Sequence, residues 1–294
     1  QISYMNSGKM TNKGWEFRVD AVPFQNKDWR VGVYFNIAHN ENKITEMPDN
    51  YIEENYTFGN GNYAYRREEG RPMGSFYGYR YKGVYQNKDA TYARDIEGNV
   101  MKDISGNAIV MRNGSYTVAP GDAIYEDVNH DGVINQYDIV YLGNSNPRLT
   151  GGAGLNVSYK QFKLSAIFYG RYGQDVVNAT RLNNESMRGI DNQSTAVLRR
   201  WRNEGDQTDI PRALYGEGYN TLGSDRFVED ASYLRLKSLS FTYRLPKKAI
   251  QRWGFNNIDV YVTGYNLFTW TKYTGQDPEV KTENTYARDT ATTP

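Results

Sequence analysis

Three pairs of alternating segments, separated by long polar stretches, constrain the fold of this 294-residue chain most strongly. Apolar residues occupy every second position in each pair, which is typical of β-strands with one apolar and one polar face. Each pair is predicted to be joined by a tight turn. The predicted strands are Trp15–Phe24 with Trp29–Ala38, Gly152–Lys160 with Phe162–Arg171, and Tyr233–Leu245 with Ile258–Trp270. A chain that alternates short turns with long loops places every short turn at one end of its sheet.

That asymmetry is typical of transmembrane β-barrels, whose turns are short on the periplasmic side and long on the extracellular side. The regions 39–149 and 172–232 are therefore predicted to be long extracellular loops. The predicted fold class is all-β, a portion of a transmembrane antiparallel β-barrel with about six barrel strands. The alternative is a soluble antiparallel sheet that packs its apolar face on a core.

Aromatic residues at both ends of the predicted strands favour the membrane interpretation. Such residues gather in girdles where a barrel meets the two membrane–water interfaces. The short-turn end carries Phe24, Trp29, Tyr159 and Phe162, with Trp253 close by, and the long-loop end carries Phe168, Tyr172, Trp270 and Tyr273.

The overall composition excludes several classes of protein. The aromatic fraction of 14% is too high for a disordered chain, although only 38% of residues are hydrophobic. The net charge of +1 implies no attraction to nucleic acid, and no nucleic-acid partner is expected. Because the chain has no cysteine, disulfides, thiolate metal sites and a cysteine nucleophile are excluded.

Further local signals predict smaller features. The apolar phase changes between Leu236 and Leu239, which indicates a β-bulge at Lys237–Ser238. Short strands are expected around Phe76–Tyr85 and Ile109–Val118, and a short helix is expected at Thr195–Arg202.

The twelve residues 127–138 carry the sharpest local motif. Their oxygen-bearing side chains alternate, a glycine follows at the sixth position and a carboxylate closes the segment, as in a calcium loop of the EF-hand type. The last position is Asp138 where an EF-hand has glutamate, a difference in which the loop resembles dockerin modules. The predicted calcium ligands are Asp127, Asn129, Asp131, the backbone carbonyl of Val133, and Asp138. The alternative is a turn held by its own Asp and Asn side chains without metal.

No residue pattern predicts catalysis. The two histidines, His39 and His130, lie in no arrangement with a nucleophile. The acidic pairs Glu53–Glu54 and Glu68–Glu69 are interpreted as solvated charge. The glycines of Gly59–Gly61 lack the flanking strand and helix of a phosphate loop. The protein is therefore predicted not to be an enzyme.

Several phrases of the sequence resemble those of SusC/RagA-type TonB-dependent transporters. They occur in the family's order over nearly the whole chain. The phrases are Asn12-Lys13-Gly14-Trp15-Glu16, Gly74-Ser75-Phe76-Tyr77-Gly78-Tyr79 with Gly83-Val84-Tyr85, Pro120-Gly121-Asp122 leading to Asp127–Asp138 and Gly143-Asn144-Ser145-Asn146-Pro147, Trp201 with Thr208-Asp209-Ile210-Pro211-Arg212, Phe227–Leu236, and Tyr265–Trp270 with Gly275-Gln276-Asp277-Pro278-Glu279.

The resemblance implies a 22-stranded barrel in the outer membrane of a Gram-negative bacterium. Residues 1–294 would be a C-terminal portion of it, approximately strands 16 to 21, with the plug domain and the last strand outside this sequence. The family imports oligosaccharides or oligopeptides, driven through TonB and covered by a SusD-like surface lipoprotein. Expected partners are that lipoprotein, the TonB complex through the N-terminal part, the substrate and outer-membrane lipid.

Two other functions stay open beside import. One is a soluble calcium-binding adhesion or dockerin-like module, and the other is a barrel that acts only as a scaffold for an outer-membrane assembly. For an importer, ligand contacts are expected from Tyr- and Asn-rich loops and from side chains that face the lumen, because aromatic faces stack on sugars and polar groups bind hydroxyls or peptide groups.

Overall fold

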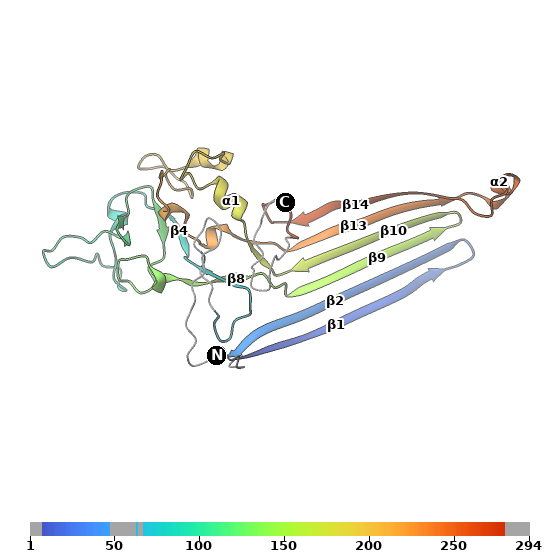
Figure 1. Ribbon diagram of the computed structural model, residues 1–294, viewed down its shortest axis with the longest axis horizontal. Coiled ribbons are helices and arrows are strands. Elements are labelled where there is room, and N and C mark those ends of the chain that lie inside the picture. The colour runs from blue at the N-terminus through green and yellow to red at the C-terminus, as the bar shows by residue number, and fades with distance from the viewer. Residues whose placement is uncertain (1–7, 48–62, 64–66, 280–294) are drawn as a thin grey trace, which may run out of the picture.

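A six-stranded antiparallel sheet forms one half of the molecule, and the long loops form the other half (Figure 1). The computed structural model describes residues 8–47, 63 and 67–279. The strands of the sheet are β1 (Lys9–Gln25), β2 (Trp29–Glu46), β9 (Leu149–Tyr159), β10 (Phe162–Tyr172), β13 (Tyr233–Arg244) and β14 (Asp259–Thr271). Their order in the sheet is β1-β2-β9-β10-β13-β14, so the six strands lie side by side in the order in which they occur along the chain. The three strand pairs expected from the sequence are confirmed.

The short turns lie together at the end of the sheet opposite the loops (Figure 1). In the first turn, the Asn26 side chain accepts hydrogen bonds from the backbone N–H groups of Asp28 (2.9 Å) and Trp29 (2.8 Å). In the second, Lys160 has a left-handed backbone (φ 50°). The third connection is not the tight turn that was expected, because it contains the helix α2 (Lys247–Ile250) followed by a 3₁₀ turn at Gln251–Trp253.

The first strand pair is longer than the sequence pattern indicates. The β1–β2 ladder continues from Trp15 opposite His39 to Lys9 opposite Glu46, through residues that are mostly polar. The predicted loop 39–149 therefore begins too early. The sequence pattern did not reveal this extension, because a strand with polar side chains on both faces shows no alternation of apolar and polar residues. The backbone hydrogen bonds of the ladder form without any apolar side chain.

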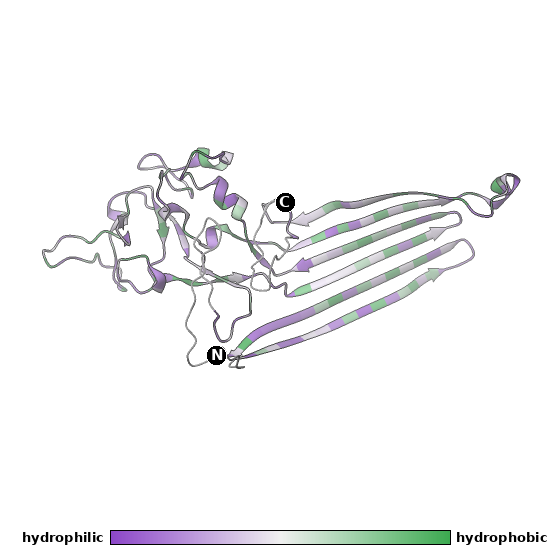
Figure 2. Cartoon of the chain, in the orientation of Figure 1, coloured by the Kyte–Doolittle hydropathy of each residue, from purple (hydrophilic) through white to green (hydrophobic). Residues whose placement is uncertain are grey.

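The register brings the apolar residues of all six strands onto one face. One row across the sheet runs Val19, Phe35, Ala153, Phe168, Leu236 and Phe268, and another runs Phe24, Val31, Val157, Leu164, Phe241 and Val262. Hydrophobic and hydrophilic positions accordingly alternate along the strands (Figure 2). Phe17, Phe35 and Trp270 on this face are 53%, 44% and 53% exposed, so no part of the described chain covers them.

Bulges keep the apolar face continuous. Between Leu236 and Ser238 of β13 the pairing with both β10 and β14 shifts, which places Leu236 and Leu239 on the same face. The bulge expected at Lys237–Ser238 is confirmed. A second shift in β1, between Ala21 and Phe24, includes Pro23, a residue that cannot donate to a ladder.

The chain is all-β, with an antiparallel sheet that forms a portion of a barrel, as expected. No helix within residues 8–47, 63 and 67–279 is long and apolar enough to cross a membrane. In the loops, short strands pair two by two. They are β3 (Ser75–Gly78) with β8 (Val140–Asn144), β4 (Tyr81–Val84) with β7 (Ala123–Tyr125), β5 (Arg112–Asn113) with β6 (Tyr116–Thr117), and β11 (Asp175–Val177) with β12 (Val228–Asp230).

The short strands expected around Phe76–Tyr85 and Ile109–Val118 are confirmed by β3 to β6. The helix expected at Thr195–Arg202 is a 3₁₀ helix over Thr195–Arg199. A six-residue helix, α1 (Ala179–Asn184), follows β11, and Asn178 caps it by accepting a hydrogen bond from the Arg181 N–H. Further 3₁₀ turns lie at Asp89–Thr91, Gln136–Asp138, Tyr219–Thr221 and Asp225–Phe227.

A charge placed on the apolar face should destabilise the sheet far more than the same charge on the polar face. We expect Leu155→Asp to lower the free energy of unfolding of the full-length barrel in lipid vesicles by about 2 kcal/mol. Asn156→Asp is the matched control, because Asn156 lies on the opposite face and its side-chain oxygen only accepts a hydrogen bond from Ser165. Guanidinium titration in vesicles measures both. Equal effects would contradict the assignment of the lipid face.

Candidate functional site

The two long loops form one packed assembly beyond the loop end of the sheet (Figure 1). The backbone of Tyr79 in the first loop bonds to Gly223 in the second (N···O 2.9 Å). Ten buried residues, eight from the first loop and two from the second, form its main core. They are Tyr79, Tyr85, Ala93, Met111, Val118, Ala123, Tyr125, Ile134, Tyr219 and Leu222. The two loops are therefore packed together around a hydrophobic core of their own.

Tyrosines supply much of that core. Tyr125 and Tyr219 are 2% and 3% exposed, and the Tyr125 hydroxyl donates to the Tyr219 carbonyl (3.0 Å). Burial raises the pKa of Tyr81 and of Tyr85 to about 12. The rings of Tyr125 and Tyr219 are buried in the core, so they are not accessible to a ligand. From the sequence, ligand contacts were expected from loop tyrosines in general. Exposed tyrosines in the loops include Tyr137 and Tyr215.

Asp122 lies at the centre of the polar network in the assembly. Its carboxylate is fully buried and forms an ion pair with Arg212 (Nε···Oδ1 2.7 Å). It also accepts hydrogen bonds from the Tyr116 hydroxyl (2.7 Å), the Ala119 N–H (2.8 Å) and the Asn220 amide (3.2 Å). The network thus fixes the second loop to the first through one carboxylate.

Gly121 brings the same two segments together by close packing. Its backbone is left-handed (φ 87°), and a Cβ atom there would lie 2.2 Å from the Trp201 ring. The Gly121 carbonyl accepts a hydrogen bond from the Arg212 N–H (2.7 Å). Two phrases that are 80 residues apart, Pro120–Asp122 and Trp201 with Thr208–Arg212, are therefore parts of a single contact.

A second polar cluster joins the sheet to the segment that follows β14. Arg235 of β13 is almost fully buried and pairs with Asp277 and with Glu279 (Nη1···Oε2 2.9 Å), and Lys237 also binds Glu279 (2.7 Å). Gln174 donates to the Pro278 carbonyl (3.3 Å). These ion pairs hold residues 277–279 against the polar face of the sheet, which explains the phrase Gly275–Glu279.

The calcium-type loop, residues 127–138, closes on itself through its own side chains. The Asp127 carboxylate accepts hydrogen bonds from the N–H groups of Asp131 (3.2 Å) and Gly132 (2.8 Å). Asp131 accepts from the Val133 N–H (2.8 Å) and from the Asn129 amide (2.9 Å). Gly132 has a left-handed backbone (φ 79°), as the sharp turn requires.

Asp138 brings the end of the loop back to its start. The two carboxylate oxygens of Asp138 accept hydrogen bonds from the N–H groups of Val128 and Asn135 (2.8 Å each), and the residue is fully buried. Burial raises the pKa of Asp138, and the nearby charges of Asp127 and Asp131 raise it further. The charges of Asp127 and Asp131 thus act on Asp138, and the described residues include no arginine or lysine that forms an ion pair with any of the three.

The described residues contain no group of three or more His, Cys, Asp or Glu side chains that could hold a metal ion by themselves. The predicted set differs because it also uses the Asn129 amide and the Val133 carbonyl. The hydrogen bonds of the loop are those expected of the metal-free alternative. Calcium therefore stays a prediction.

The hydrogen bonds given for the two histidine rings among the described residues go to backbone carbonyls and not to a nucleophile. The ring of His39 bonds to the Arg148 carbonyl (2.6 Å), and exposed His130 bonds to the Arg94 carbonyl (3.3 Å). Glu53–Glu54 and Gly59–Gly61 lie outside the described residues.

Known proteins are similar to this chain over nearly its whole length, although no protein-family model matches it. TonB-dependent receptor P3 of Formosa agariphila is 32% identical over 286 residues, which cover 95% of this chain and 26% of that receptor. TonB-dependent receptor SusC of Bacteroides thetaiotaomicron is 28% identical over 285 residues, covering 94% and 25%. The chain thus spans about a quarter of the length of these curated relatives.

Solved structures agree. A structure of the RagAB peptide transporter superposes with a TM-score of 0.70 at 26% identity, over 98% of this chain and 28% of that one. The RagAB peptide importer in its "open-open" state gives 0.64 at 25% identity, over 98% and 27%. Sheet and loops together match a segment of TonB-dependent β-barrel receptors. The chain is similar to the SusC/RagA type of these receptors over nearly its whole length, which confirms the resemblance seen in its sequence.

Removal of the charge on Asp122 should loosen the loop assembly. Asp122→Asn keeps the shape of the side chain but leaves Arg212 without its partner. Since Arg212 is about one-third exposed, we expect a cost of about 1–3 kcal/mol. Proteolysis of loop 75–144 under native conditions should then be clearly faster in the full-length protein.

Glu126→Gln is the control, since Glu126 forms partly exposed ion pairs with Arg80 and Lys82. That change should cost at most about 1 kcal/mol. If both variants were cleaved at the same rate, Asp122 would not hold the assembly.

Proposed function

We propose that this chain forms part of the barrel wall and of the extracellular loops of an outer-membrane importer. The importer would take up nutrient oligomers, either oligosaccharides or oligopeptides, using energy delivered through TonB. A SusD-like lipoprotein would cover its extracellular mouth. The observation that carries this proposal is the match of sheet and loops together to the RagAB peptide transporter, over 98% of the chain.

The sheet supports a position in the membrane. One face carries apolar rows across six strands, with Trp29 and Tyr159 in contact at the turn end (ring centroids 4.3 Å apart). The opposite face carries polar side chains such as Asn36, Asn156 and Ser165, which would line a lumen. A soluble calcium-binding module needs the apolar face covered, but large apolar side chains on it are about half exposed.

The loops support a role at the mouth of the barrel. Their core and the Asp122 network make them a preorganised body, which could present a fixed surface to a lid and to a substrate. Ligand contacts would come from polar side chains on the lumen face and from exposed loop residues such as Tyr137 and Tyr215.

Deletion of the full-length receptor should abolish uptake of the substrate oligomer. We expect growth on the nutrient to stop in the deletion strain, and to stop also when the partner lipoprotein alone is deleted. Uptake of a labelled oligopeptide and of a labelled oligosaccharide, measured side by side, identifies the class. A deletion strain that imports every tested oligomer at the normal rate would favour the scaffold function instead.

We further propose that residues 127–138 bind a structural calcium ion. The ligands would be Asp127, Asn129, Asp131, the Val133 carbonyl and Asp138, and the ion would offset the repulsion among the three carboxylates. Loop and core are in direct contact, because a Cβ at Gly132 would lie 2.9 Å from Ala93. The ion would therefore stiffen this part of the assembly and take no part in chemistry.

Calcium at a hundredfold excess over its Kd should slow opening of this loop about 100-fold, by mass action. Limited proteolysis of residues 120–145 with calcium or with a chelator measures this. Asp127→Ala and Asp131→Ala should remove the difference. Asp95→Ala is the control, because Asp95 accepts similar backbone hydrogen bonds from Glu97 and Asn99 in an exposed turn. Unchanged cleavage of the unmodified protein in chelator would contradict a metal.

A further inference from the structure

A polar pocket of about 480 Å³ lies in the second long loop, at the C-terminal end of α1 (Figure 1). Its size is that of a small-molecule site. The polar side chains that line it are Asn183, Asn184, Ser186, Arg188, Asp191 and Asn192, and the remaining wall consists of Gly189 and Gly216. Every described residue of the lining is therefore polar or a glycine.

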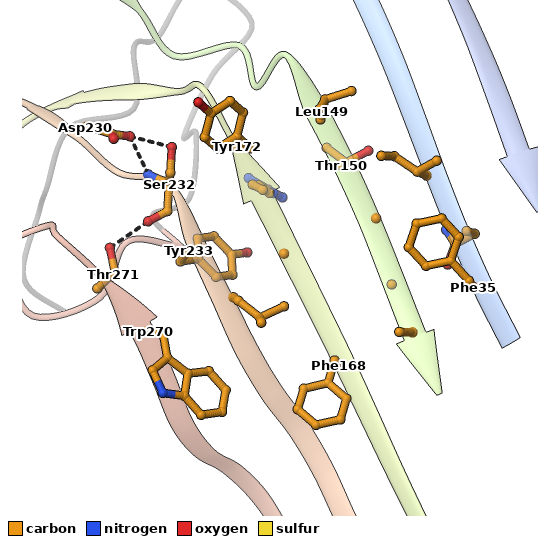
Figure 3. Close-up of a pocket in the computed structure, with 18 of the residues that line it drawn as sticks. Phe35, Leu149, Thr150, Phe168, Tyr172, Asp230, Ser232, Tyr233, Trp270 and Thr271 are labelled. Atoms are coloured by element: carbon orange, nitrogen blue, oxygen red, sulfur yellow. Dashed lines mark hydrogen bonds between the residues drawn. The ribbon is translucent and has the colours of Figure 1, made fainter. Parts of the chain in front are cut away.

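This lining distinguishes the pocket from the groove at the loop end of the sheet. Phe35, Phe168 and Trp270 lie around that groove (Figure 3), and they belong to the apolar face that the proposed function places in lipid. The described lining of the loop pocket offers no apolar side chain to a lipid or to a peptide. A ligand that fits it carries hydrogen-bonding groups over most of its surface.

Met187 shapes one wall of the pocket. Its backbone is left-handed (φ 48°), a conformation that is uncommon for a residue other than glycine and that often occurs at ligand sites. The Met187 side chain is buried with Val197 and Ile210, so this small core holds the unusual backbone in place. Met187 thus turns inward, and its neighbours Ser186 and Arg188 line the pocket.

Two backbone hydrogen bonds join the walls of the pocket. The Asn184 carbonyl accepts from the Ser194 N–H (2.9 Å), and the Arg188 carbonyl accepts from the Gly216 N–H (2.9 Å). The end of α1, the segment 186–192 and the chain at Gly216 are therefore held together before any ligand arrives. Such preorganisation lowers the cost of binding.

The asparagine side chains of the pocket are available to a ligand. Those of Asn183, Asn184 and Asn192 form no hydrogen bond to another group of the described chain. Other asparagines of the same assembly differ, because Asn178 caps α1 and Asn220 binds a buried carboxylate. An amide donates through its nitrogen and accepts through its oxygen, so the pocket presents both kinds of group.

The charges in the lining balance. Arg188 and Asp191 contribute one positive and one negative charge, and neither forms an ion pair among residues 8–47, 63 and 67–279. A charged ligand would meet a like charge as well as an opposite one, so the pair favours a ligand without net charge. Both groups can form charge-assisted hydrogen bonds with hydroxyls.

We propose that this pocket binds a neutral oligosaccharide through its hydroxyl groups. The proposal deepens the proposed function, on which the extracellular position of the pocket rests, and it assigns the glycan class to this site. A sugar hydroxyl both donates and accepts hydrogen bonds, so it matches an asparagine amide in either direction. A peptide would leave its apolar side chains without a wall to pack on.

Binding of the full-length receptor, in detergent and without a lid protein, to a printed array tests the proposal. The array carries neutral glucan, mannan, galactan and fructan oligosaccharides, uronic-acid oligosaccharides, and di- to hexapeptides. We expect retention of a neutral oligosaccharide, with a Kd that rises about tenfold in the double variant Asn184→Ala/Asn192→Ala, which removes two amides. Gln193→Ala is the matched control, because Gln193 is exposed, follows Asn192 and does not line the pocket.

Asp191→Asn tests the charge balance. It keeps the capacity for hydrogen bonds and leaves Arg188 as the one charge of the described lining. We expect uronic-acid oligosaccharides to bind about threefold more tightly to this variant than to the unmodified receptor. Unchanged binding of these acidic probes would contradict the assignment of the lining.

Equal affinities of the double variant and of the Gln193→Ala receptor would overturn the proposal, and so would retention of peptides alone or of no array ligand. Uptake assays on the same variants separate this inference from the proposed function. A receptor that imports an oligomer but shows no dependence on the pocket overturns only the glycan site. One that binds the oligosaccharide through these residues but imports nothing overturns only the importer.

Discussion

The antiparallel ladder of backbone hydrogen bonds is the constraint on which the rest of this structure depends. A strand that crosses lipid must satisfy every N–H and carbonyl group through its neighbours. The ladder in turn fixes the register, and the register places rows such as Val19, Phe35 and Ala153 on one face. Because the strands run antiparallel with short turns at one end, both long loops leave from the other end and meet there.

The loop assembly depends on a few contacts between distant segments. Asp122 joins Tyr116, Arg212 and Asn220, and Gly121 makes room for the Trp201 ring. Arg235 and residues 277–279 make a similar connection between the sheet and the chain beyond β14. A buried charge is costly unless it is paired, so each of these contacts constrains two segments at once. Family phrases that look unrelated in sequence are thus the two halves of single contacts.

Sequence patterns located the strands wherever one face is apolar. They also located the bulge in β13, because Leu236 and Leu239 can share a face only if one residue is extra. They missed the polar extension of β2, which is held by β1 on one side and by the backbone of residues 70–71 at Ile44. They also treated loop tyrosines as available to a ligand, although Tyr125 and Tyr219 are buried in the loop core. A tyrosine that packs in a core and a tyrosine that contacts a ligand look the same in the sequence, so only their burial in the structure distinguishes them.

The sequence by itself determined the class of fold, the sides of the sheet and the family, because these follow from residue spacing along single strands and from short phrases. The calcium-type spacing at 127–138 is also a property of the sequence alone. Only the tertiary structure decided which distant residues meet, as Asp122 meets Arg212, and which residues of neighbouring strands face one another, as Gly151 faces Gly170. The physical reason is that such contacts depend on register and loop packing, which are set by the whole sheet and not by any one segment.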